Sequence, residues 1–161
     1  MGKDALRSRL IGYNVGARFG SPILVLRDLD HDSPCAGNLI AELLPERHPS
    51  CLIRVAVRAI EAWLMADVDG LSRAAQLRVS IFPQAPEQEA DPKRSFVDLL
   101  RQSRSRALRN ALDFGGDGPT RQMLGAWTSE FVRTEWDPDR AIAHRRAPSL
   151  ERCLLRLRSL R

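Results

Sequence analysis

The chain has 161 residues, of which 43% are apolar and 28% are charged, a composition typical of one globular domain and not of a disordered segment. No apolar run approaches the roughly 18 to 20 residues that a membrane-spanning helix needs, and the opening "MGKDALRSRL" lacks the apolar core of a secretory signal. The net charge of +5 is uneven, because residues 1–92 hold ten basic and twelve acidic side chains, whereas residues 93–161 hold fifteen and eight. Basic charge beside an acidic segment suits a nucleic acid, although arginines on solvated helix faces would give the same count.

The first half of the chain predicts alternating strands and helices. Residues 11–16, "IGYNVG", are expected to form a loop. The continuous branched apolar run at 23–26 predicts a buried strand of a parallel sheet. Apolar residues at helical spacing predict a helix over 36–44, ended by the proline that follows. Residues 52–58 alternate as a second strand does, and a further helix is expected from about Glu61.

A strand, a helix and a second strand predict a parallel pair whose strands both end at one edge of the sheet. Ligands of open α/β sheets bind at that edge. We therefore expect the acids after the first strand to lie near Glu61, which follows the second. The α/β part should cover about residues 1–80.

The second half predicts helices. Residues 80–95 read as a loop, and Asp91-Pro92 is typical of a helix start. One helix is expected over 92–111 and another over 119–133. A short helix at "WDPDRA" and a last one after Pro148 should follow. No flexible linker interrupts the chain, so a single domain over 1–161 is expected, with its helical part at about 90–161.

Three acids, Asp28, Asp30 and Asp32, follow the first predicted strand at every second position. If the strand continues to residue 30, Asp28 and Asp30 point to the same side, and two neighbouring carboxylates repel unless a cation or proton lies between them. Hard oxygen ligands suit Mg²⁺ or Mn²⁺. The plainer interpretation is a solvated acidic turn, in which Asp32 caps the next helix.

Other charged residues could complete such a site. Glu61 is a candidate third metal ligand; a plain structural interpretation makes it a first-turn acid of its helix and places Asp67 on the surface. Arg54, Arg58 and Lys93 are candidates for binding substrate phosphates.

Cysteine and histidine usage argues against other metals. The three cysteines have no CxxC spacing and the three histidines make no HxxxH or HxH pair. A disulfide framework and a zinc site are therefore not expected, and a reducing, cytoplasmic setting is.

Segments along nearly the whole chain, about residues 2–160, carry a family resemblance. They are "VLRDLDHDSPCAGNL", "IRVAVRAIEAWLMAD", "DPKRS", "SRSRALR", "GP" and "WDPDRA…APSLERCLLRL". In this order they closely resemble the DUF4276 family, uncharacterised bacterial proteins with a Toprim-like fold that are related to the nuclease domain of OLD-family proteins. The DxD and "IEAWLMAD" segments are the most specific.

The resemblance implies a Toprim-like α/β domain that uses acidic residues and Mg²⁺ for phosphodiester chemistry, in bacterial phage defence beside an AAA-type ATPase. Asp28 and Asp30 match the Toprim DxD pair, and Glu61 matches the glutamate of "IEAW". Two departures bear on activity. A Toprim domain begins with a strand that ends in glutamate, whereas no glutamate precedes Glu42 here, so this first element is expected to be missing. Ala59 also stands where family members often carry an acid.

Three functions remain open at this point. The first is a metal-dependent nuclease-like domain acting on nucleic-acid phosphodiesters. The second is a catalytically inactive module, derived from the Toprim fold, that binds nucleic acid or a partner. The third is a haloacid-dehalogenase-like phosphatase, which "VLRDLDHD" resembles; "FGGDG" does not follow a strand as that chemistry requires, and this alternative ranks lowest.

Overall fold

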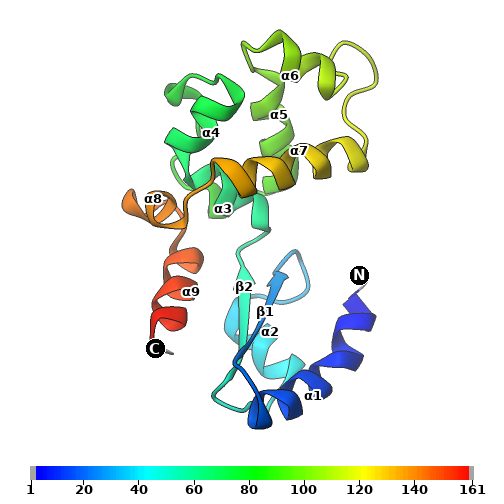
Figure 1. Ribbon diagram of the computed structural model, residues 1–161, viewed down its shortest axis with the longest axis vertical. Coiled ribbons are helices and arrows are strands. Elements are labelled where there is room, and N and C mark those ends of the chain that lie inside the picture. Colours follow the sequence, from blue (N-terminus) through cyan, green and yellow to red (C-terminus); the bar gives the residue numbers. More distant parts are fainter. Residues whose placement is uncertain (1–2, 160–161) are drawn as a thin grey trace.

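Two parallel strands, β1 (Ile23–Asp28) and β2 (Cys51–Ala56), form the sheet in the computed structural model, which describes residues 3–159 (Figure 1). Ile23 lies opposite Cys51 and Asp28 opposite Ala56, so both strands end at the same edge. Helix α2 (Ala36–Leu43) connects them. The predicted strand, helix and strand are thereby confirmed, and the chain is mixed α/β.

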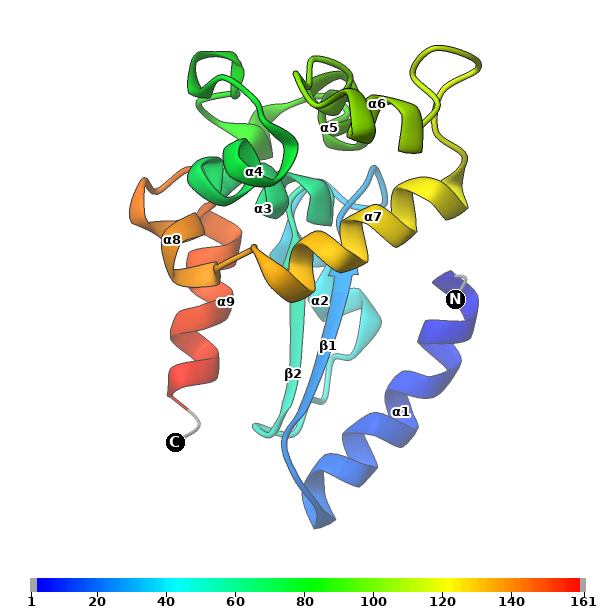
Figure 2. The same cartoon turned by 45° about the horizontal axis from the view of Figure 1, so that its top comes forward.

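Helices cover both faces of this sheet. On one face, α1 (Lys3–Phe19) and α2 bury the side chains that β1 and β2 direct toward them. On the other face, α9 (Pro148–Arg158) packs against the end of β2 (Figure 2). The last face is covered incompletely, because Leu24 and Leu26 of β1 remain 44% and 43% exposed.

The remaining helices lie beyond the end of the sheet. They are α3 (Ile60–Ala66), α4 (Val68–Ala75), α5 (Pro92–Arg101), α6 (Arg106–Ala111), α7 (Arg121–Thr134) and α8 (Pro138–Ala143), with single 3₁₀ turns at Val79–Ile81 and Pro86–Gln88. Most of these helices form a second core, while α8 packs into the cluster that contains α9. Helices α3 to α7 share one apolar cluster centred on Phe96, Met65 and Leu100, so the helical part starts at α3, earlier than the sequence suggested. Within residues 3–159, no helix combines the length and apolarity needed to cross a membrane.

The loop expected at residues 11–16 is wrong, because this segment lies inside α1. Leu10, Tyr13, Asn14 and Ala17 recur at helical spacing and turn inward, with Leu10 fully buried against the sheet. The Asn14 amide also donates to the carbonyl of Glu46 at 2.9 Å and accepts from the amide of His48 at 2.7 Å. Tertiary packing therefore outweighs the low helix propensity of the glycines in this segment.

The single helix expected over 92–111 is also wrong, because α5 ends at Arg101 and α6 begins at Arg106. Buried Ser103 lies between them and donates from its hydroxyl to the carbonyl of Ala75 at 2.5 Å. Ser105 then caps α6 by accepting from the amide of Leu108 at 3.2 Å. Serine side chains that bond to backbone groups favour such breaks over a continuous helix.

Asp67 is not on the surface but has no solvent exposure. Both of its oxygens face the guanidinium of Arg140, with Nε–Oδ1 and Nη2–Oδ2 distances of 2.5 and 2.7 Å. Its carboxylate also accepts from the amides of Gly70 and Asp137, both at 3.0 Å. Asp67 therefore ties the junction of α3 and α4 to the start of α8.

Candidate functional site

Asp28 lies at the carboxyl end of β1, where the sheet meets the helical part. Its Oδ1 accepts the backbone N–H of Ile60, the first residue of α3, at 2.8 Å. Its Oδ2 lies 3.2 Å from Nζ of Lys93 in α5. Because β1 and β2 end at one edge and α3 begins there, the fold brings this carboxylate to the ligand edge that the sequence predicted.

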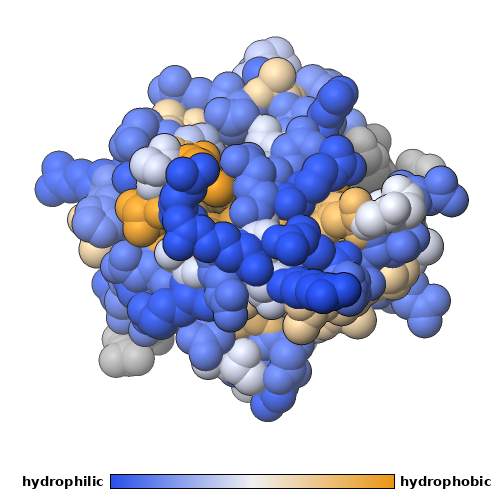
Figure 3. All heavy atoms as spheres, turned by 90° about the horizontal axis from the view of Figure 1, so that it is seen from above, coloured by the Kyte–Doolittle hydropathy of each residue, from blue (hydrophilic) through white to orange (hydrophobic). Residues whose placement is uncertain are grey.

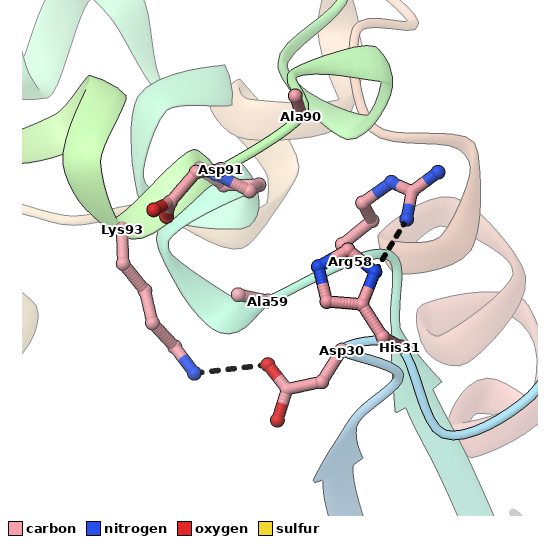
Figure 4. A pocket seen from close by; sticks show the side chains of 8 residues that line it. Asp30, His31, Arg58, Ala59, Ala90, Asp91 and Lys93 are labelled. Atoms are coloured by element: carbon pink, nitrogen blue, oxygen red, sulfur yellow. Dashed lines mark hydrogen bonds and ion pairs between the residues drawn. The ribbon is translucent and has the colours of Figure 1, made fainter.

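Asp30 reaches the same lysine by a different backbone path. Strand β1 ends at Asp28, and Asp30 has a left-handed φ of 47°, so the expectation of a strand continuing to residue 30 is wrong. Its amide still donates to the carbonyl of Arg58 at 2.8 Å, and Leu29 is buried between the two acids. Asp30 Oδ1 lies 3.1 Å from Lys93 Nζ (Figure 4). One ammonium group therefore joins both carboxylates.

Asp32 does not belong to this cluster and does not cap the following helix. Helix α2 is capped by Cys35, whose sulfur accepts from the amide of Asn38 at 3.4 Å. Asp32 instead pairs with Arg27 of β1. The acids of this turn therefore pair with two different cations: Asp32 with Arg27 of β1, and Asp30 with Lys93 of α5.

Glu61 is the third acid at this edge and lies in the first turn of α3. Its Oε2 is buried and has no hydrogen-bond partner within residues 3–159. Burial raises the pKa of Glu61; a backbone hydrogen bond opposes this shift, and repulsion from Asp28 adds to it. We call Asp28, Asp30 and Glu61 the acid cluster.

Lys93 is the cation of the acid cluster. It follows the Asp91 cap, whose side chain accepts from the amide of Arg94 at 3.0 Å, as predicted for the start of this helix. Partial burial opposes the lysine charge, but the hydrogen bonds to Asp30 and Asp28 raise the pKa of Lys93 overall. The sequence made Lys93 a phosphate-binding candidate; in the described structure its ammonium is held by carboxylates.

Two cavities meet at Lys93. The smaller, of about 240 Å³, has Asp30, His31 and Arg58 on its walls, and Arg58 Nη1 lies 3.4 Å from His31 Nδ1 (Figure 4). The larger, of about 660 Å³, runs between α3, α5 and α7 and includes Glu61. We call the larger one the basic groove; it is lined by Glu61, Lys93, Arg94, Val97, Asp98, Arg101, Arg121 and Leu124.

The structure brings most of the predicted site residues together. Asp28, Asp30, Glu61, Lys93 and Arg58 all lie around these two cavities. Arg54 does not, because it lies further back in β2 and lines a separate pocket. The sequence prediction did not group the arginines that line the basic groove, Arg94 and Arg101 of α5 and Arg121 of α7. The signal that could have identified them is their position on the polar faces of two predicted helices.

The acid cluster fits a hard divalent cation in the chemistry of its donors. It supplies carboxylate oxygens, among them Oε2 of Glu61, for which the described residues provide no hydrogen-bond donor. Among the described residues, however, no group of three or more His, Cys, Asp or Glu side chains is assembled to hold a metal. Lys93 lies between the two aspartates instead, so a divalent ion would have to replace its ammonium.

Replacing Glu61 with glutamine should stabilise the protein at pH 7 by about 0.5 to 2 kcal/mol. Because the pKa of Glu61 is raised in the folded state, the folded protein binds this proton more tightly than the unfolded chain. Wild-type stability should therefore fall as pH rises from the ordinary glutamate pKa through the folded-state value, whereas Glu61→Gln should lack this loss. Urea unfolding between pH 4 and pH 8 measures the difference.

The exposed Glu42 of α2 provides the matched control. Glu42→Gln should leave the pH dependence of stability unchanged. A Glu61→Gln protein that is less stable than wild type at pH 7 would show that the glutamate charge is compensated in the folded state.

A scan against protein-family models, a search of curated proteins and a search of solved structures found no match to this chain.

Proposed function

We propose that the acid cluster binds Mg²⁺ or Mn²⁺ in exchange for the Lys93 ammonium, and that the protein is a metal-dependent, nuclease-like domain with a Toprim-like fold. One observation carries the proposal: Asp28 at the end of β1 and Asp30 in the turn after it share a single ammonium group. Beside them lies a third carboxylate, with a buried oxygen that has no hydrogen-bond partner among the described residues. The resemblance of the DxD and "IEAWLMAD" segments to DUF4276 proteins supports the same chemistry.

Each residue has a defined place in this proposal. Asp28, Asp30 and Glu61 would hold the cation, which supplies an activated water and stabilises charge on phosphate oxygens. Lys93, once released, stays within reach of a bound phosphate because it lines both cavities. Arg58 is the second phosphate contact in the smaller cavity.

The basic groove is the proposed path of the nucleic-acid backbone. Arg94 and Arg101 each lie 3.7 Å from an oxygen of Asp98, and these exposed pairs are weak enough to be exchanged for phosphates. Arg121 lies across the groove on α7. The face seen from the helical end of the molecule is largely hydrophilic, with small apolar patches, as a wet nucleic-acid interface is (Figure 3).

A cation titration tests the metal site. Millimolar Mg²⁺ or Mn²⁺ should raise the melting temperature, by about 5 to 10 °C once the cation exceeds its Kd a hundredfold. Asp28→Asn should abolish the shift while keeping the oxygen that accepts from Ile60. The melting temperature of Lys93→Met should rise at a lower cation concentration than that of wild type, because this variant lacks the ammonium that competes for the carboxylates.

The exposed Asp117 outside the acid cluster is the control, and Asp117→Asn should respond as wild type does. If neither cation stabilises wild type or Lys93→Met, the metal site does not exist. Cleavage of single-stranded and duplex DNA and RNA with Mn²⁺, absent in Asp28→Asn, tests the nuclease activity.

The second candidate is a catalytically inactive binding module derived from the same fold. The Lys93 bridge favours it, because the lysine neutralises the acid pair without any metal. This module would bind nucleic acid through the basic groove with salt-sensitive affinity and without cleavage. An AAA-type ATPase partner, implied by the family resemblance, stays a prediction for either candidate.

A further inference from the structure

A second charged site lies on the face of the sheet that α9 covers. Arg47 precedes β2, Arg54 lies within it, and Arg156 comes from α9. Together with Pro49, Leu52 and Ile53 they line a cavity of about 210 Å³. We call this cavity the arginine pocket; it shares no lining residue with either cavity at the acid cluster.

Arg54 is the central residue of the arginine pocket. Its Nη1 donates to the carbonyl of Ile53 at 3.1 Å, but its Nε is buried and finds no hydrogen-bond partner in the part of the chain that the structure describes. Burial lowers the pKa of Arg54; Cys153 opposes this shift, and the charges of Arg47 and Arg156 reinforce it. The pocket therefore concentrates positive charge at a group that is already short of solvent.

Among residues 3–159, no carboxylate pairs with these charges. The lining residues of the pocket include no Asp or Glu, and none of the three arginines takes part in an ion pair in the described part of the chain. Arg156 donates to two neutral oxygens within the described residues, those of Ser159 at 3.1 Å and Pro49 at 3.5 Å. Arg54 and Arg156 are half-buried, whereas Arg47 is exposed at the rim. Because charges taken from solvent are normally paired, the buried Nε of Arg54 is the atom that lacks an anion.

We propose that the arginine pocket binds a single phosphate group in its dianionic form, either as inorganic phosphate or as a terminal phosphate monoester. Guanidinium groups bind phosphate oxygens through paired, charge-assisted hydrogen bonds, and three of them match a dianion better than the single charge of a phosphodiester. The cavity is smaller than the roughly 300 to 1,000 Å³ of pockets that enclose whole drug-sized ligands, so it suits one group. Buried Leu52 keeps one wall apolar, which strengthens the attraction.

Calorimetry and thermal unfolding test this proposal, with inorganic phosphate and glycerol phosphate compared with chloride at equal ionic strength. Both phosphates should bind and raise the melting temperature of wild type, and chloride should not. Arg54→Met should weaken binding about tenfold or more, because the variant loses its charge-assisted hydrogen bonds to the phosphate. Arg152→Gln, an exposed position on the same helix as Arg156 but outside the pocket, is the control and should bind as wild type does.

Two further variants test the proposal if Arg54→Met does not fold. Arg156→Gln should weaken phosphate binding from the helix side, and Arg54→Lys should retain part of it because the charge remains without the planar fork. Equal stabilisation by chloride, or equal weakening in Arg152→Gln and the pocket variants, would overturn the proposal by showing diffuse attraction.

Oligonucleotides distinguish the sources of the phosphate. Binding of an oligonucleotide with a 5′-phosphate should be weakened by Arg54→Met, whereas binding of the same oligonucleotide with a 5′-hydroxyl should be unchanged. Equal dependence of both oligonucleotides on Arg54 would overturn the monoester assignment in favour of the backbone. The result is independent of the acid cluster, because a failed metal titration leaves the phosphate titration unchanged.

Discussion

Replacing Arg140 with methionine is expected to lower the free energy of unfolding by about 3 to 5 kcal/mol, because it leaves a buried carboxylate without its cation. Asp67 has no solvent exposure, and Arg140 contacts both of its oxygens. The loss should appear as a lower urea midpoint with an unchanged slope.

An exposed pair of the same kind is the control. Arg133 lies 2.6 Å from Glu130, but both side chains are more than half exposed, so Arg133→Met should change stability by no more than about 0.5 kcal/mol. Adding Asp67→Asn to Arg140→Met should recover part of the stability, because the uncompensated charge is then removed. A double variant as unstable as the single one would show that packing of the Arg140 stem, not charge, holds α8 in place.

Phe96→Ala should also lower the free energy of unfolding by about 3 to 5 kcal/mol. Phe96 is fully buried on α5 and lies 6.3 Å from the ring centroid of Trp127, which stacks on Phe131 at 5.6 Å. Removing its ring leaves a cavity at the centre of the helical core. Urea unfolding followed by tryptophan fluorescence measures the loss.

Phe19→Ala is the matched control, because the side chain at the end of α1 is 86% exposed. It should change stability by no more than about 0.5 kcal/mol. Similar losses for the two variants would mean that the helical core closes around the missing ring or that Phe19 is covered in solution.

The sequence predicted the part of the fold that places the acid cluster. Strands predicted at 23–26 and 52–58 with a helix between them leave little choice but a parallel pair, and its common edge then places Asp28 near Glu61. These inferences needed only local apolar patterns and one rule of chain topology.

The Lys93 bridge could not be predicted in this way. Asp30 and Lys93 are separated by 63 residues, and their contact depends on how α5 packs, which no local pattern encodes. The left-handed turn at Asp30 likewise depends on the hydrogen bond that its backbone N–H donates to the carbonyl of Arg58 and on burial of Leu29. Helix α1 was missed for another reason: its inward-facing residues have helical spacing, but its glycines weigh against a helix when propensity is considered alone.

The small size of the sheet determines how β1 and β2 can exchange their amide protons with solvent. Within residues 3–159 it contains β1 and β2 alone, so each strand is an edge, and two isolated strands are marginal in water. The strand pair must therefore persist because α1, α2 and α9 cover it. Amide protons of β1 and β2 should then exchange with solvent through events that detach a covering helix, not through fraying of the ladder. We expect the acid cluster to stay assembled for as long as these helices, which pack well away from the carboxylates, remain in place.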